Sequence, residues 1–153
     1  MSSSVPAAVV GFHNALVAGV PSPTLIHFGE PRQNTDAPEH VSVAYAGEGG
    51  GDVIDTTSDW ASLGAQRHEE RFEVTNALVV WAGDDSEAAL QTAFLRAYVV
   101  FAAIAAAVDN DITLAGSVRE SRIGSHSTAV EQTSRGVSVT LTFRLVCAVR
   151  VTY

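Results

Sequence analysis

The sequence contains no lysine, so all nine of its basic residues are arginine, against 17 acidic residues and a formal net charge of −8. No stretch of the chain gathers these arginines into a basic cluster. Proteins that grip a nucleic-acid backbone need such a cluster to neutralise phosphates. The composition therefore argues against a phosphate-gripping surface, although it allows DNA to pass nearby without being held.

Cysteine is almost absent as well, since Cys147 is the only one in 153 residues. It lies within an alternating apolar segment, which predicts a small buried side chain and not a nucleophile, a metal ligand or half of a disulfide. A chain of this length can bury a core without disulfides, and it corresponds to one domain, residues 1–153. A reducing compartment fits this composition.

Targeting signals are not expected. No basic region precedes the apolar residues 5–20, and Pro6, His13 and Asn14 interrupt them, so we predict no signal peptide and synthesis in the cytoplasm. The apolar run at residues 97–108 is shorter than the roughly 20 residues that span a bilayer. We therefore expect no contact with a membrane.

A long central helix is predicted over residues 84–108. Asp84 can serve as its N-cap, with Glu87 three residues later completing an acidic capping box. Apolar residues then recur at steps of four and three, which places them on one helical face: Leu90, Phe94, Ala97, Phe101, Ile104 and Val108. Beyond residue 97 the helix is apolar on every side, which suits either an ordinary central helix or one that also meets a second subunit.

A second, shorter helix and several strands complete the predicted fold. Ser4 can cap a helix that carries Val5, Val9, Phe12 and Leu16 at helical spacing and ends at Gly19. Alternation predicts strands at residues 24–28, 40–46, 72–81, 117–132 and 137–151. Because runs of strands are separated by so few helices, we predict an α+β fold: a mainly antiparallel sheet of four to five strands with two helices on one face.

The glycine-rich and acidic segment at residues 47–59 is predicted to be a loop. A phosphate-binding loop would need glycines spaced to open a helix, usually with a lysine, and this segment has neither. We therefore expect a mobile surface loop, ordered only in an assembly if at all, with no assigned role for Gly47 to Gly51.

Two short segments resemble catalytic groups but lack the required pattern. The run from His68 to Glu70 has no second histidine four residues on, as a zinc helix requires, and a strand would turn Glu69 and Glu70 to opposite faces. Ser125 and His126 have no glycine-framed nucleophile elbow. We therefore predict no catalytic residues, no metal ligands and no cofactor, and that the chain is not an enzyme.

Three motifs in the middle of the chain resemble those of a known family, which is the tail terminator (tail completion) family of long-tailed phages, especially phages of actinobacterial hosts. They are Trp60-x-x-Leu63-Gly64, Arg67-x-x-Glu70-Arg71-Phe72 and Val80-Trp81-x-Gly83-Asp84-Asp85. The order and spacing of these motifs, together with the chain length, carry the resemblance.

The resemblance implies a small α+β subunit that assembles into a hexameric ring in the host cytoplasm and becomes part of the virion neck. Such a ring caps the head-proximal end of the tail tube, stops its polymerisation and offers a surface to the head-side connector protein. DNA passes through its lumen without specific binding. The family brings no catalytic residues and no cofactors.

The residues themselves also suit a ring. A ring needs a heterologous contact between neighbouring subunits whose repetition closes the circle. Spare apolar surface is expected on the second face of the sheet, through Val79, Trp81, Val146 and Ala148, or on the rear of the central helix. Charged rims would set orientation. The expected contact residues, with either the next subunit or the tail tube, are Trp60, Arg67, Glu69, Glu70, Arg71 and Trp81.

Two other functions remain open at this stage. A head-to-tail connector or stopper is also a small ring-forming subunit of the same neck, and the sequence does not separate it from a terminator. A small ligand-binding domain or enzyme would have to use His68 with Glu70, or Ser125 with His126.

Overall fold

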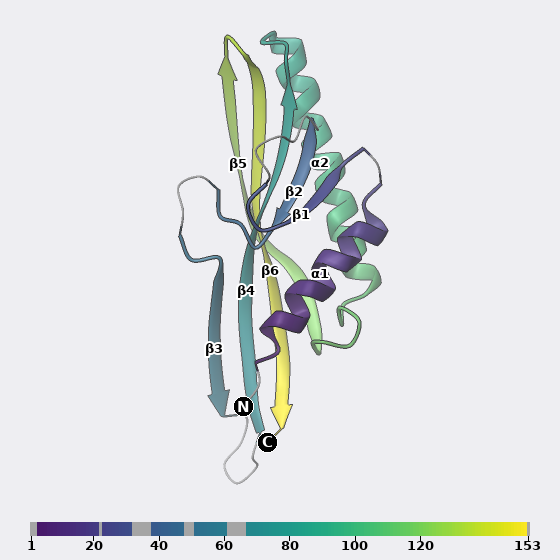
Figure 1. The fold of residues 1–153 in the computed structure, drawn as a ribbon, viewed down its shortest axis with the longest axis vertical. Helices are drawn as coiled ribbons and strands as arrows, with labels where there is room; N and C mark the ends of the chain where they lie inside the picture. Colours follow the sequence, from purple (N-terminus) through teal and green to yellow (C-terminus); the bar gives the residue numbers. More distant parts are fainter. Residues whose placement is uncertain (1–2, 22, 32–37, 48–50, 61–66, 153) are drawn as a thin grey trace.

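The computed structural model describes residues 3–21, 23–31, 38–47, 51–60 and 67–152, with only the backbone of residues 60, 67, 151 and 152. Two helices and six strands follow one another along the chain (Figure 1). They are α1 (Val5–Gly19), β1 (Leu25–Phe28), β2 (Glu39–Val43), β3 (Ile54–Trp60), β4 (Arg67–Ala82), α2 (Glu87–Asn110), β5 (Glu120–Thr133) and β6 (Gly136–Thr152).

Two long antiparallel strands, β4 and β6, form the spine of the sheet. They are 16 and 17 residues long and pair from Arg67 with Thr152 to Ala82 with Val137. The strand order is β1-β2-β4-β6-β5, and among the described strands only the β1–β2 pair is parallel. Strand β3 also pairs with β4, on the half of β4 that β2 leaves free, so β2 and β3 lie end to end along one edge of the spine.

Both helices cover the same face of the sheet (Figure 1). Alternate residues of β6 from Val137 to Cys147 are buried beneath them, as the strict alternation in the sequence predicts. Phe143 contacts both helices, since its ring centroid lies 6.5 Å from that of Phe12 on α1 and 5.6 Å from that of Phe101 on α2. The core therefore lies between the β4–β6 spine and the two helices.

The predicted fold class is confirmed: the chain is α+β, with a mainly antiparallel sheet and two helices on one face. The number of strands was underestimated, because β3 lies within the segment that we predicted to be a loop. Six of its seven residues are described with side chains, and all but Ile54 are exposed. Strand β3 is thus held mainly by backbone pairing with β4, and it has almost no apolar alternation to reveal it.

The ends of several elements also differ from the prediction. The strand predicted at residues 40–46 ends at Val43, since Ala44 adopts a left-handed conformation with φ 57°. Strand β4 is longer than predicted, because its polar first residues are held between β3 and β6. Strand β5 begins at Glu120, three residues later than the predicted segment. Helix α1 agrees with its prediction in its bounds and in the burial of Phe12, and Ser4 occupies the N-cap position, but the Ser4 side chain makes no capping hydrogen bond.

The N-cap predicted for the central helix is wrong. Ser86 caps α2 instead, accepting a hydrogen bond from the backbone N–H of Ala89 at 3.1 Å. The Asp84 carboxylate accepts hydrogen bonds from the Ser86 backbone N–H at 3.0 Å and from its hydroxyl at 3.1 Å. Asp84 therefore orders the turn before the helix, and the true cap comes two residues later.

The buried face of α2 is rotated slightly from the predicted one. Phe94 is 39% exposed, whereas the small residues Ala93, Ala97 and Ala107 lie against the core. Small side chains let a helix approach a sheet closely, which explains why they take the inner positions. Leu90 and Phe101 are only partly buried.

Helix α2 is more apolar than its burial requires. Its 24 residues include an 18-residue window with a mean hydropathy of 1.6, of which 33% is buried. By length and composition alone it meets the criterion for a membrane-spanning helix, contrary to the sequence expectation, but core helices of other proteins meet it too. Here one side of α2 packs on β4, β6 and α1. The other side carries apolar residues that the chain itself leaves uncovered.

Candidate interaction surface

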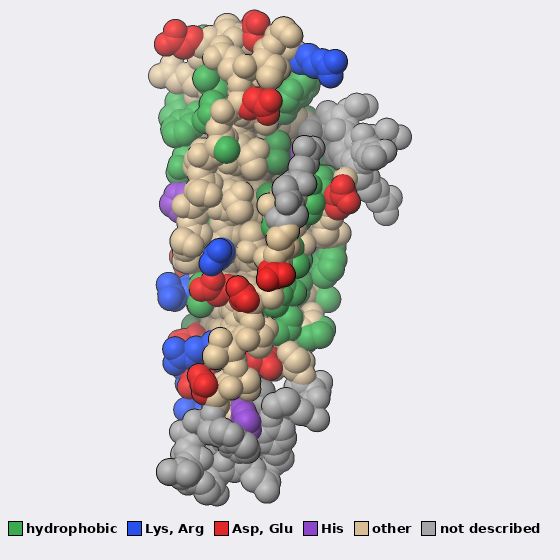
Figure 2. Space-filling model, turned by 90° about the vertical axis from the view of Figure 1, so that its left-hand side faces the viewer, with side chains coloured by type: hydrophobic (Ala, Val, Ile, Leu, Met, Phe, Trp, Pro, Cys, Tyr) green, Lys and Arg blue, Asp and Glu red, His purple; other side chains and the backbone are tan. Residues whose placement is uncertain are grey.

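The face of the sheet opposite the helices, here called the open face, divides into two parts. Strand register places alternate residues of β4, β5 and β6 on it. The half nearer the β5–β6 turn has no charged side chain until Glu131, which lies at its end. We call this half the neutral half. It comprises Thr75, Ala77, Val79, Ser127, Ala129, Ser138, Thr140 and Thr142, of which Ala77 is only 2% exposed. Figure 2 shows few charged side chains in this region and many below it.

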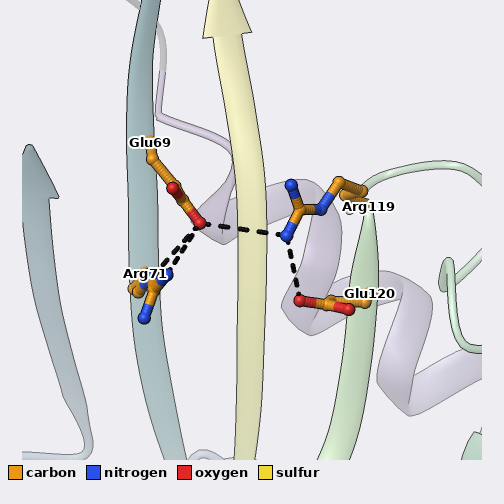
Figure 3. A network of polar contacts seen from close by, with 4 residues as sticks. All are labelled: Glu69, Arg71, Arg119 and Glu120. Atoms are coloured by element: carbon orange, nitrogen blue, oxygen red, sulfur yellow. Dashed lines mark hydrogen bonds and ion pairs between the residues drawn. The ribbon is translucent and has the colours of Figure 1, made fainter. Parts of the chain in front are cut away.

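The other half of the open face carries an ion-pair network (Figure 3). Glu69 on β4 accepts from Arg71 at 3.1 Å and lies 3.9 Å from Arg119, which in turn contacts Glu120 at 3.1 Å. The contact between Glu69 and Arg119 reaches across β6. Because the side chain of Arg71 is 69% exposed, such pairs contribute only about 0–1 kcal/mol to folding. They are available to orient a partner.

The predicted contact residues do not all share one surface. Glu69 and Arg71 lie together on the open face, whereas Glu70 is 5% exposed and lies on the helix-covered face. The Glu70 carboxylate accepts hydrogen bonds from the Ser3 hydroxyl and the Ser4 backbone N–H, both at 3.0 Å. Glu70 therefore anchors the start of α1 to β4, and we leave it out of the contact surface.

Two of the predicted contact residues are tryptophans at opposite ends of the sheet. Trp81 lies near the end of β4 and is 49% exposed on the open face, beside the neutral half. The side chains of Trp60 and Arg67 lie outside the described residues, as do Leu63 and Gly64 of the first sequence motif.

The side chains considered for catalysis are held in structural contacts. The His68 ring lies 3.4 Å from the Ser58 hydroxyl, on the neighbouring strand, while Glu70 is bound to the start of α1. The His126 ring packs against Phe101, with centroids 4.9 Å apart, and Ser125 lies at a register shift in β5. Within the described ranges, no three His, Cys, Asp or Glu side chains gather as a metal site would require.

A buried polar cluster joins β2 to α2 and was not predicted from the sequence. The Arg96 guanidinium donates to both oxygens of Glu39, at 2.6 and 3.1 Å, and the Thr24 hydroxyl donates to the same carboxylate at 2.9 Å. Glu39 is only 8% exposed. The hydrogen bond from Arg96 lowers the pKa of Glu39 against the opposing effect of burial. The partners are 57 residues apart, and no local pattern could have revealed the pair.

Replacing Glu39 by glutamine is expected to lower the free energy of unfolding at pH 7 by about 2 kcal/mol, as expected for hydrogen bonds to a charged group. A carboxyl whose pKa is lower in the folded state stabilises the protein above its unfolded pKa and loses this effect as the pH falls. The difference between wild type and Glu39→Gln should therefore shrink below about pH 4.5. Urea unfolding at pH 7 and pH 3.5 measures it.

The exposed Glu131→Gln variant is the control for that comparison, and it should match wild type at both pH values. A difference between wild type and Glu39→Gln that persists at the lower pH would contradict the charged hydrogen bond. Such a result would assign the effect to packing.

The exposed side of α2 carries an apolar row that we call the outer stripe. It consists of Leu95, Val99, Ala102 and Ala106, which follow one another at helical spacing. Leu95 is 60% exposed and Val99 is 57% exposed. Beyond Ala106, toward the C-terminus of the helix, the next exposed charged residue is Asp109. Apolar surface on the rear of this helix was predicted from the sequence, but the residues that form it were not.

The outer stripe lies on the side of α2 that faces away from the core, and α2 covers the sheet on the face opposite the open face. The two surfaces therefore lie on opposite sides of the molecule. Comparison with known proteins assigns neither surface to a family: no protein-family model and no curated protein matches this chain.

Proposed function

We propose that this chain is the tail terminator subunit of a long-tailed phage. In this proposal its copies form a ring, with six as the expected number, at the head-proximal end of the tail tube. The ring stops polymerisation of the tube and offers its other surface to the head-side connector protein. The three sequence motifs support the choice of family, and the α+β fold with two helices is of the kind that the resemblance implies.

The observation that carries the proposal is the outer stripe of α2. Burying apolar surface contributes roughly 25 cal/mol per Å², so two large side chains that are more than half exposed represent an unused driving force for association. Exposed apolar rows on soluble proteins mark interaction sites. An assembly protein is therefore favoured over a catalyst.

The position of the two surfaces also supports a ring. A heterologous contact uses two different surfaces of each subunit, and it closes into a ring when the rotation between neighbours allows it. This chain has such a pair, the outer stripe on the helix layer and the open face on the far side of the sheet.

The charge of the chain suits passage of DNA. With −8 on each copy, a hexamer carries 6 × −8 = −48. Like-charge repulsion would then keep DNA from adhering to the channel wall, so that it slides through. The terminator would need no specific contact with the DNA.

A combination of light scattering and negative-stain imaging tests the proposal, using the purified chain alone and with the tail-tube protein of the same phage. We expect a closed ring, either free or at the ends of tubes of uniform length. A monomer that leaves the tubes unlimited in length would overturn the proposal.

A connector or stopper of the same neck is the second candidate, and the same two surfaces would serve it. Sedimentation with isolated tubes and with DNA-filled heads separates the two functions. Binding to tube ends is expected for the terminator, whereas binding to filled heads alone would identify a connector.

A further inference from the structure

We propose that neighbouring copies of this chain contact each other through the outer stripe of α2, which packs on the neutral half of the next copy's open face. This inference rests on the proposed ring and names the surfaces that build it. The occupant of the neutral half is thus a second copy of the same chain.

The chemistry of the two surfaces matches. The outer stripe contains only leucine, valine and alanine, and the neutral half contains only threonine, serine, valine and alanine. Packing one on the other would therefore remove no charge from water, which is the most costly part of forming an interface. Threonine methyl groups and Val79 offer apolar contact to the stripe.

The dimensions of the two surfaces match as well. From Leu95 to Ala106 the stripe extends over about 17 Å at 1.5 Å per helical residue. From Ser138 to Thr142 the neutral half extends over about 14 Å along β6 at 3.4 Å per residue. A helix laid along the strands would thus cover the neutral half over its length.

The charges that border the two surfaces allow an ion pair between copies at the end away from the β5–β6 turn. Both surfaces begin at the same end of the molecule, because α2 follows Ala82, which pairs with Val137 at the start of β6. Toward the other end, the stripe is followed by exposed Asp109 and the neutral half by exposed Arg144, which within its own copy pairs with Glu73 at 3.0 Å. A ring keeps all its copies pointing the same way along its axis, so Asp109 of one copy would approach Arg144 of the next.

Disulfide trapping between copies tests this contact. The native Cys147 is 1% exposed and burial raises its pKa to about 12, so its thiol is not expected to form disulfides in this experiment. Equal amounts of Val99→Cys and Thr140→Cys chains are mixed and oxidised, and we expect a disulfide-linked 1:1 dimer. Ser138→Cys replaces Thr140→Cys if the latter does not fold.

The matched control is Val17→Cys on α1, because Val17 and Val99 are both 57% exposed. With Thr140→Cys it should form at least about tenfold less dimer, a difference corresponding to about 1.4 kcal/mol. Equal yields from Val17→Cys and Val99→Cys would overturn the proposed contact. So would self-linking of Val99→Cys as rapid as its linking to Thr140→Cys, which would indicate two stripes packed face to face.

A chain carrying both Val99→Cys and Thr140→Cys separates this inference from the proposed function. A ladder of linked species that ends at one closed size supports both. A ladder that continues without closing supports the contact but contradicts the ring. A ring seen by imaging, without the Val99–Thr140 link, contradicts the contact and leaves the ring.

Discussion

Truncation of Phe143 to alanine is expected to lower the free energy of unfolding by about 3–5 kcal/mol, the usual cost of removing a buried aromatic ring. Phe143 is 0% exposed and contacts Phe12 of α1 and Phe101 of α2 from its position on β6. A single residue thus joins both helices to the spine of the sheet. The cavity left behind would loosen all three elements together, since interiors relax only partially.

Urea unfolding followed by circular dichroism measures this loss. Phe28→Ala is the matched control, because Phe28 is 56% exposed at the end of β1 and its truncation should cost less than about 1 kcal/mol. If both variants lost the same stability, Phe143 would not occupy the centre of the core.

Replacing Gly136 by alanine is expected to destabilise the protein by about 3–5 kcal/mol, through backbone strain and a steric clash together. Gly136 begins β6 with φ +138°, a conformation that residues with a side chain rarely adopt. An added Cβ would also lie 2.1 Å from the carbonyl oxygen of Ala82, which belongs to the backbone of β4 and cannot move aside. The turn between β5 and β6 would have to shift away from β4.

The variant Gly29→Ala distinguishes the effect of backbone strain from that of the steric clash. Gly29 has φ +78°, but a Cβ there meets nothing within 4 Å, so only the strain of about 1 kcal/mol should remain. Thermal unfolding of both variants gives the comparison. Equal losses would show that the close approach to Ala82 contributes nothing to the effect of Gly136→Ala.

The sequence predicted those parts of the fold where burial follows a simple period. The alternation of β6 from Val137 onward and the helical spacing of Phe12 and Leu16 are each set by contact with one core, and the structure has both. The fold class follows from the order of these elements, which is why it could be predicted without the three-dimensional pairing.

Where backbone pairing or distant contacts decide the structure, the sequence was not sufficient. Strand β3 exposes nearly all its described side chains, so neither period marks it. The choice of Ser86 over Asp84 as N-cap depends on where the turn after β4 ends, and the sequence alone does not decide between two capping residues two positions apart. The pair between Glu39 and Arg96 exists only because the fold brings β2 beside α2.

The candidate surface was predicted in part. Strand alternation correctly placed Glu69 and Glu70 on opposite faces, but it did not show which face the helices would cover. Glu70 lies under α1, whereas Glu69 and Arg71 remain accessible. The residues of the outer stripe could not be predicted, because the apolar run from residue 97 has no polar side. Which of its residues are exposed depends on how α2 packs in the folded chain.

The spine also determines how this protein must fold. Arg67 pairs with Thr152 and Ala82 with Val137, so the paired residues of the two central strands are 55 to 85 positions apart in the sequence. Non-local pairing of this kind gives a high contact order. Folding slows as contact order rises, because the chain loses the entropy of closing a long loop before the contacts form. During synthesis, β4 and α2 are complete before β6, the strand that completes the core, has been made. Until β6 emerges, β4 therefore has an unpaired edge, and such edges make partly folded chains prone to aggregation.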